Sequence, residues 1–155
     1  MRRSDREVTE KSELINILEK GDSCHIALCD GDTPYLITMN YGYEWTDNLI
    51  IYLHCAKEGR KIDIIKKNPK VCFSVDTGHE LVVSETACGW GMKYKSVVGN
   101  GTIEIIENNA EKLKGLNLLM QHYSGKSDFT YEEKMLQATA LLRIKIVDIT
   151  GKEKK

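Results

Sequence analysis

Three apolar segments separated by short turns constrain the fold more than any other feature of this chain. The segments cover residues 24–29, 35–41 and 49–54. The first two flank residues 30–34, Asp-Gly-Asp-Thr-Pro, whose glycine, aspartates and proline favour the backbone angles of a hairpin connection. A second turn is predicted at residues 44–48. Short connections of this kind join antiparallel neighbours, so the three segments predict an antiparallel meander.

A longer apolar segment, residues 94–106, predicts a strand that contains Gly99 and Gly101. Glycine inside a strand indicates a bend, a bulge or the close approach of another group, as the corners of a small barrel require. Further strands are predicted at residues 71–75, around 81–84 and at 141–149, with residues 88–93 as a loop or a bulged strand. The direction of the strand at 71–75 relative to the one at 49–54 stays open, and so does the strand order.

Helices are predicted at the margins of this sheet. They cover residues 10–20 with Thr9 as N-cap, residues 60–67, residues 110–123 with Asn109 as N-cap, and a short segment that begins with the capping-box sequence Thr130-Tyr131-Glu132-Glu133. Six or seven strands, mostly joined as antiparallel neighbours, with flanking helices predict an α+β chain, mainly β, built around a small barrel.

Bulk properties narrow the range of partners. A length of 155 residues suits a single domain with one core. The formal charge of −1, from 22 basic and 23 acidic residues, gives no overall field that would attract nucleic acid or an anionic membrane. No apolar run approaches the length of a membrane span, and we expect a cytoplasmic protein. Binding must therefore come from a local site.

The five cysteines do not predict a disulfide framework or a metal site. Their number is odd, and no Cys-x-x-Cys pair is present. Cys24 precedes His25, and His54 precedes Cys55, but neighbouring side chains on a strand point to opposite faces and cannot chelate one ion together. Cysteine as a small apolar strand residue is the simpler interpretation.

The end of the third apolar segment carries the strongest functional signal. Gly59 is followed by Arg60 and Lys61, two cations in the first turn of the helix predicted at 60–67. The helix macrodipole favours carboxylates there and cations at the opposite end, so helix stability alone does not explain the pair. Free N–H groups at a helix start together with two cations suit a phosphate. The alternative, that both side chains simply reach into solvent, stays open at this point.

Three segments in order resemble the flavin-binding split-barrel family, which includes pyridoxamine 5′-phosphate oxidase-like proteins and flavin reductases. They are residues 52–61, Tyr-Leu-His-Cys-Ala-Lys-Glu-Gly-Arg-Lys, residues 62–75, and residues 94–104, which begin Tyr-Lys-Ser-Val-Val-Gly. Within the family the chain looks most like the 5-nitroimidazole resistance (Nim-type) branch. The resemblance implies an antiparallel split barrel of six or seven strands, a flavin cofactor, and a homodimer with the flavin in a groove between the subunits.

The resemblance also implies a role for nine positions. They are Thr38, Met39, Asn40, His54, Cys55, Ala56, Arg60, Lys61 and Ser96. Residues 38–40 match positions that line the flavin ring and its ribityl chain, and residues 54–56 match the strand end that passes along the cofactor. Arg60 and Lys61 match the phosphate-binding pair, and Ser96 matches a polar contact from the long strand. FMN is favoured over FAD, because the basic pair offers one phosphate site and no second nucleotide motif is present.

Two departures from the family pattern affect the expected activity. The chain ends with residues 149–155, Ile-Thr-Gly-Lys-Glu-Lys-Lys, and lacks the arginine- and histidine-bearing segment with which pyridoxamine phosphate oxidases bind their substrate phosphate. That activity is therefore not expected. Position 59 is glycine rather than a hydroxyl residue, which removes one phosphate donor but leaves its N–H.

A flavin-dependent reductase of nitroaromatic or other small electron-poor compounds is the leading functional hypothesis, with a nicotinamide donor. His54 is the candidate catalytic residue, because imidazole titrates near neutral pH and can donate a proton to a reduced nitro group. A histidine that only bonds to backbone is the alternative for this position. A nonenzymatic flavin-binding sensor or carrier is a second hypothesis. A haem-binding split barrel, with His54 or His25 as axial ligand, is a third.

Overall fold

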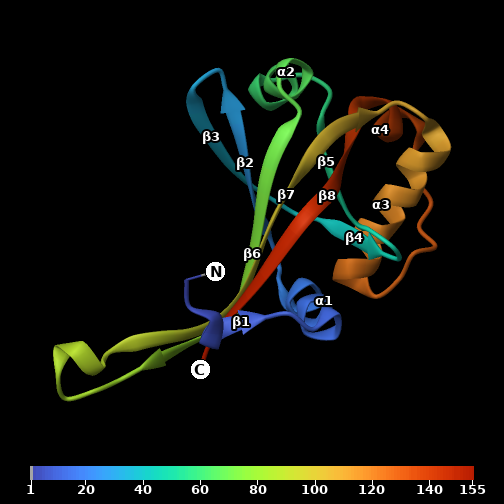
Figure 1. Cartoon of the computed structure of the whole chain (residues 1–155). Coiled ribbons are helices and arrows are strands. Elements are labelled where there is room, and N and C mark those ends of the chain that lie inside the picture. The colour runs from blue at the N-terminus through green and yellow to red at the C-terminus, as the bar shows by residue number, and fades with distance from the viewer. Residues whose placement is uncertain (1) are drawn as a thin grey trace.

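The strands of the computed structural model, which describes residues 2–155, form one antiparallel sheet (Figure 1). The elements in chain order are η1 (Ser4–Arg6), β1 (Glu7–Val8), α1 (Lys11–Lys20), β2 (Cys24–Asp30), β3 (Thr33–Met39), β4 (Gly42–Trp45), β5 (Leu49–Ala56), α2 (Arg60–Lys67), β6 (Lys70–Val82), η2 (Ala87–Gly89), β7 (Gly91–Ile106), α3 (Asn109–Ser124), α4 (Glu133–Ala138) and β8 (Thr139–Lys154). The sheet order is β3-β2-β6-β7-β8-β5-β4, and β1 pairs with β8. The predicted fold class, an antiparallel α+β split barrel with flanking helices, is confirmed, but the sheet has eight strands instead of the predicted six or seven.

The sheet order resolves the direction that the sequence left open. β5 and β6 are joined by α2 but are not neighbours, since β8 and β7 lie between them. Each of the three successive pairings is antiparallel, so β5 and β6 run in opposite directions. The predicted hairpin is confirmed, with Asp30 opposite Thr33 at its turn. The turn predicted at 44–48 is partly wrong, because Gly42–Trp45 forms β4 and pairs with β5.

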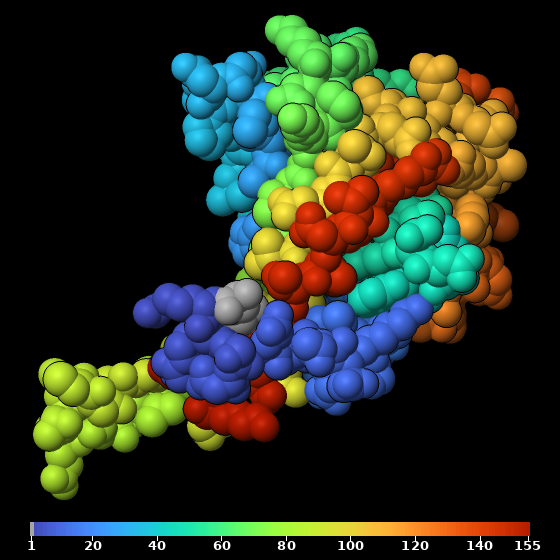
Figure 2. Space-filling view, viewed as in Figure 1, coloured from blue at the N-terminus to red at the C-terminus, as the bar shows by residue number. Residues whose placement is uncertain are grey.

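The strands β6 and β7 are longer than the sequence predicts. β6 joins the segments predicted at 71–75 and 81–84, and β7 begins three residues before the predicted start at 94. Their outer parts form a hairpin arm, residues 78–92, that projects away from the body (Figures 1 and 2). Side chains of the arm are mostly exposed on both faces, so no apolar alternation marks this part of either strand in the sequence.

The sheet encloses one main core on a single face. Ile26, Ile51, Phe73 and Ile144 from four different strands are at most 1% exposed, and Leu18 of α1 packs in the same cluster. A second cluster lies on the opposite face of β5, because successive strand residues alternate between faces. It consists of Tyr52, Ile106, Leu116 and Leu141, and α3 supplies Leu116. Among residues 2–155 no helix is long and apolar enough to cross a membrane.

The predicted helices are present, but their caps differ from the sequence prediction. Asn108, not Asn109, caps α3, and its side-chain oxygen accepts from Glu111 N at 3.0 Å. Glu10 rather than Thr9 occupies the N-cap of α1, and no side chain caps that helix. The capping box at 130–133 does not form either, because the N-cap of α4 is Glu132, two residues after the Thr130 that the motif requires.

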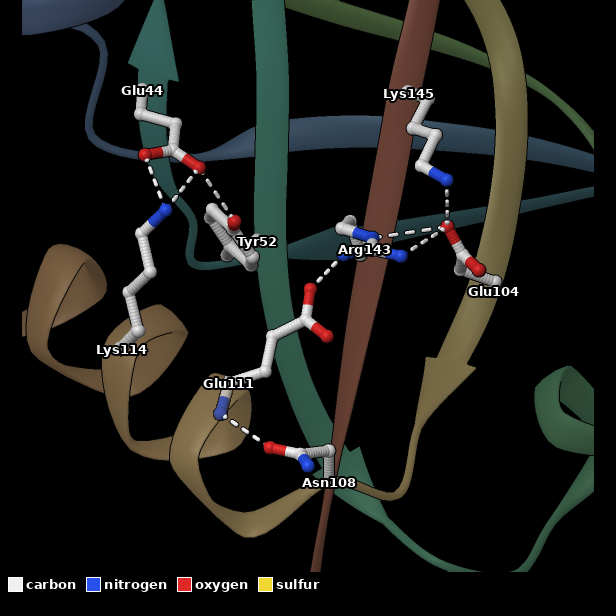
Figure 3. A network of polar contacts seen from close by, with 8 residues as sticks. All are labelled: Glu44, Tyr52, Glu104, Asn108, Glu111, Lys114, Arg143 and Lys145. Atoms are coloured by element: carbon white, nitrogen blue, oxygen red, sulfur yellow. Dashed lines mark hydrogen bonds and ion pairs between the residues drawn. The ribbon is translucent and has the colours of Figure 1, made fainter.

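The first turn of α3 is fixed to the sheet by charge (Figure 3). Glu111 pairs with Arg143 of β8, whose guanidinium also donates to Glu104 of β7 at 2.9 Å. Lys145 of β8 lies 3.0 Å from the same Glu104 carboxylate. The Arg143 side chain is only 19% exposed, so these bonds are less screened by solvent than a typical surface pair. α3 is thereby held over the second cluster.

Gly99 and Gly101 are sites of close approach, as the sequence predicts. The register between β7 and β8 shifts between Asn100 and Gly101, which marks a β-bulge. A Cβ atom at Gly101 would lie 2.1 Å from the backbone oxygen of Lys145. A Cβ atom at Gly99 would lie 2.4 Å from the ring of Phe73. Only glycine allows both contacts.

Candidate functional site

The start of α2 is the centre of the candidate site. β5 ends at Ala56, and Gly59 turns the chain into α2 with a φ of 122°, a backbone conformation that favours glycine. Gly59 O accepts from the N–H groups of Ile62 and Asp63. No side chain caps the first turn of α2. The positive end of the helix is therefore uncapped. It lies at Arg60 and Lys61, close in sequence to the end of β5.

Arg60 already has partners in the chain. Its guanidinium lies 3.2 Å from the Asp30 carboxylate and 4.7 Å from the ring centroid of Tyr35. Both residues belong to the β2–β3 hairpin, so Arg60 reaches from α2 to that hairpin. The ion pair is largely exposed and is worth at most about 1 kcal/mol. Arg60 is thus oriented by the hairpin, but it is not committed to a buried pair.

Lys61 is less exposed and points toward the end of β3. Its Nζ lies 3.9 Å from the sulfur of Met39, which is 9% exposed. No carboxylate of residues 2–155 lies within 4.0 Å of this ammonium group. Lys61 is therefore a cation with room for an anionic partner.

Lys61 lies close to residues on two strands with open edges, Met39 of β3 and His54 of β5. β3 is the last strand on one side of the sheet and pairs with β2 only. On the other side, the pairing of β4 with β5 ends at Gly42 and Tyr52, so residues 53–56 pair with β8 but with no second strand. Backbone N–H and C=O groups on these edges are free to bind a planar polar molecule.

His54 and Cys55 occupy the open part of β5 and face opposite ways. By strand alternation Cys55 shares the core face with Leu53, whereas His54 shares the face of Tyr52. His54 is an exposed residue whose ring is only partly shielded from water; this shielding, and secondly the Lys61 charge, lower the pKa of His54. Burial raises the pKa of the Cys55 thiol, and the Lys61 charge opposes that rise. At pH 7 the imidazole is therefore mainly neutral and the thiol protonated.

Lys61→Gln is expected to raise the pKa of His54, because it removes one of the two causes that depress it. The rise should be partial, since burial is the larger cause. Titration of the His54 ring protons by NMR measures the change. Lys57→Gln is the matched control, because Lys57 is exposed and near in sequence but does not act on His54. An unchanged His54 pKa in Lys61→Gln would contradict this electrostatic link.

Eight of the nine residues assigned by resemblance lie at or beside this place. Thr38, Met39 and Asn40 end β3, and Thr38 and Asn40 are exposed on either side of the buried Met39. Residues 54–56 end β5, and Arg60 and Lys61 begin α2. The sequence did not identify Asp30 and Tyr35 as partners of Arg60. It placed Asp30 in a turn, and only the sheet order brings that turn to α2.

Ser96 is the exception. It lies on β7 opposite Asp76 of β6 and Lys152 of β8. Ile103, seven residues further along β7, is the residue that bonds to Pro69 just after α2. Seven residues of strand span about 23 Å at roughly 3.3 Å per residue. Ser96 is thus far from the end of α2 along β7. Across the sheet, Val98 lies in one row with Ser74, His25 and Thr38, so Ser96 is separated from β3 by the two intervening strands β6 and β2.

The eight residues form an open surface in the single chain. None of the nine residues lines any of five hollows of about 170 to 520 Å³ on the described part of the chain. A small-molecule site normally encloses most of its ligand. A second surface would be needed to enclose a ligand here.

Comparison with known proteins settles the family. The model of the Pyridoxamine 5′-phosphate oxidase family matches residues 10–153. The chain belongs to this family. One fold family can include proteins with many different activities. Membership therefore establishes the architecture of the chain but not its reaction.

Solved structures agree with this membership. A candidate 5-nitroimidazole antibiotic resistance protein from Bacteroides thetaiotaomicron is 30% identical, with a TM-score of 0.82 over 95% of this chain and 86% of that one. The flavocytochrome Anf3 from Azotobacter vinelandii is 18% identical, with a TM-score of 0.80 over 100% and 72%. An FAD and haem binding protein from Mycobacterium smegmatis is 18% identical, with a TM-score of 0.82 over 97% and 74%. The last two share the fold.

A curated relative adds little to this picture. An uncharacterized protein of Rhizobium meliloti is 29% identical over 69 residues, which is 44% of this chain and 42% of that protein. The match thus spans less than half the length of that relative.

Proposed function

We propose that this protein is a flavin-dependent oxidoreductase whose cofactor phosphate binds Arg60 and Lys61. The observation that carries the proposal is the uncapped start of α2, where two cations meet the open edges of β3 and β5. These residues fit a flavin mononucleotide: cations and N–H groups for the phosphate, unpaired backbone for the ring edge, and Met39 beside Lys61 for apolar packing. A single phosphate site favours FMN, while the adenylate of FAD would extend into solvent.

The flavin, when bound, supplies the hydride and single-electron chemistry. The protein's own residues hold and shield it. Thr38, Asn40 and Ser96 would donate to polar groups of the ring and ribityl chain. Met39 and Cys55 would pack against one ring face, and the backbone of residues 54–56 would lie along the cofactor.

The separation of Ser96 supports a homodimer in this proposal. β2 and β6 lie between Ser96 and the open edge of β3 in one chain, so a second copy would supply Ser96 to the groove. The arm, residues 78–92, carries exposed apolar side chains that suit burial in such an assembly. They include Leu81 at 55%, Val83 at 68% and Trp90 at 50% exposure. The partners we propose are therefore a second copy and a small-molecule substrate, with no nucleic acid and no membrane.

A nitroaromatic or other small electron-poor compound is the substrate class that we favour. The similarity to the candidate nitroimidazole resistance protein covers nearly the whole chain. His54 is placed at the open end of β5, where it could donate a proton to a reduced nitro group. Because its pKa is lowered, it donates best below neutral pH, and turnover limited by this proton should rise as pH falls toward that pKa.

An absorption spectrum of the protein as purified, followed by anaerobic mixing with NAD(P)H, tests the proposal. We expect two broad flavin bands that bleach with NAD(P)H and return when a 5-nitroimidazole is added. Flavin bands that never bleach would leave a flavin-binding sensor or carrier. An intense Soret band would indicate haem with His54 or His25 as axial ligand, and a colourless protein that takes up neither cofactor contradicts all three functions.

A further inference from the structure

A hollow of about 350 Å³ lies beside α2 and is not lined by Arg60 or Lys61. Its apolar lining is Ile62 of α2 with Ile105 and Ile106 at the end of β7. α3, the segment around α4 and the start of β8 complete the walls. Figure 1 shows α2 and α4 at the same end of the sheet. The volume falls in the range of about 300 to 1,000 Å³ that small-molecule sites occupy.

Three lysines surround this apolar lining. Lys57 follows β5, Lys66 lies one helical turn after Ile62 on α2, and Lys112 lies in the first turn of α3. Glu107 is the one carboxylate that lines the hollow among the described residues. No carboxylate of residues 2–155 lies within 4.0 Å of any of the three lysine ammonium groups. The hollow therefore has an excess of positive charge.

Lys112 is the most unusual of the three. It is only 5% exposed and is the one charged or polar residue classed as buried in the described chain. Its ammonium donates to the backbone oxygen of Leu136, which is a neutral partner. Burial first, and the Lys57 charge second, lower its pKa. By comparison, Arg143 of β8 is less buried than Lys112 and yet pairs with two carboxylates. Lys112 has none within the described chain.

A buried ammonium group normally has a counter-ion, because removal of a charge from water is costly. We propose that this hollow binds a small organic anion, a carboxylate on a compact apolar body, with Lys112 as its main polar contact and the three isoleucines against its apolar part. Lys57 and Lys66 are exposed at the rim and attract the anion. The hollow adjoins the groove at the end of β5, because Ala140 and Thr139 pair with Cys55 and Ala56, but none of the nine proposed flavin-binding residues lines it. The proposal does not depend on flavin binding.

NMR titration of the ¹⁵N-labelled protein with sodium benzoate tests this site, with benzamide and inorganic phosphate as comparison ligands at equal ionic strength. Benzoate should shift the amide signals of Asn109, Lys112 and Thr139 in a saturable manner. Benzamide lacks the charge and phosphate lacks the apolar body, so both should bind at least about tenfold more weakly, as expected for loss of one charge-assisted contact.

Lys112→Met should weaken benzoate binding by about 10- to 150-fold, the range for one charge-assisted hydrogen bond. Because Lys112 is buried, a second variant guards against a folding defect. The double change Lys57→Met and Lys66→Met alters only exposed side chains and should also weaken binding. Lys67→Met, on the same helix but outside the hollow, should leave binding unchanged.

Three results would overturn the proposal. If benzamide or phosphate bound as tightly as benzoate, the ligand class would not be an organic anion. If benzoate affinity were unchanged in both lysine variants, the lysines would have no role in binding. If no saturable shift appeared at residues 105–112 and 137–140, the hollow would not be a binding site.

Discussion

Replacement of both Arg60 and Lys61 by alanine is expected to lower flavin affinity by about two to four orders of magnitude, since each charge-assisted phosphate contact is worth roughly 1.5–3 kcal/mol. Neither side chain has a strong interaction within the described part of the chain. Arg60 forms an exposed ion pair with Asp30, and Lys61 has only the Met39 sulfur beside it. The bound flavin is first removed from the protein. Fluorescence titration of this flavin-free protein with FMN then measures the change in affinity.

The control for this prediction is the double change Lys67→Ala and Lys70→Ala. It removes the same number of charges from the end of α2 and the residue that opens β6, and both side chains are exposed. It should retain flavin, because these charges lie at the opposite end of the helix. Equal flavin loss in both double variants would indicate a general effect of net charge, and unchanged affinity in the first would show that the phosphate lies elsewhere.

The same variants can show whether two chains build one site. If Ser96 comes from a second copy, a bulky change such as Ser96→Trp should also abolish flavin binding. A mixed dimer of the Ser96→Trp chain and the Arg60→Ala, Lys61→Ala chain would contain one fully defective groove and one intact groove. The isolated mixed dimer is therefore expected to bind about half of the wild-type flavin content. No recovery in a mixed dimer of confirmed composition contradicts the shared groove.

The sequence predicts the local structure around α2 well for a physical reason. Gly59, Arg60 and Lys61 lie in one continuous run, and a helix start and its dipole are local properties. The predicted bounds of α2, residues 60–67, are confirmed. Glycine at positions 99 and 101 likewise reports close contacts, because no other residue would fit there.

What the sequence could not give is any property that depends on sheet order. Arg60 meets Asp30 and Tyr35 only because β2 and β3 lie at one side of an open sheet and α2 reaches across to them. The distance of Ser96 from the groove depends on the same order. The sequence carried no signal for Lys112 either, since a lysine at the start of a helix normally faces solvent, and its contact with Leu136 O of α4 depends on the fold.

The arm was missed for a different reason. Residues 78–92 do not alternate between apolar and polar faces, because neither face is buried within one chain. Strand prediction depends on that alternation, so it split β6 into two pieces. Their exposed apolar side chains are the part of the pattern that a second copy would explain.

Gly101→Ala is expected to destabilise the fold by about 3 kcal/mol, which corresponds to a decrease in melting temperature of about 6–12 °C for a chain of this size. The new methyl group would lie 2.1 Å from the backbone oxygen of Lys145, and backbone in the middle of the β7–β8 pair cannot move aside without loss of ladder bonds. The matched control is Gly91→Ala on the same strand, where the nearest atom is the flexible end of the Lys154 side chain. Thermal unfolding followed by circular dichroism measures both. Equal stability of the two variants would contradict the close approach at the bulge, whereas a selective loss in Gly101→Ala would support it, because only this position meets backbone that belongs to the β7–β8 ladder.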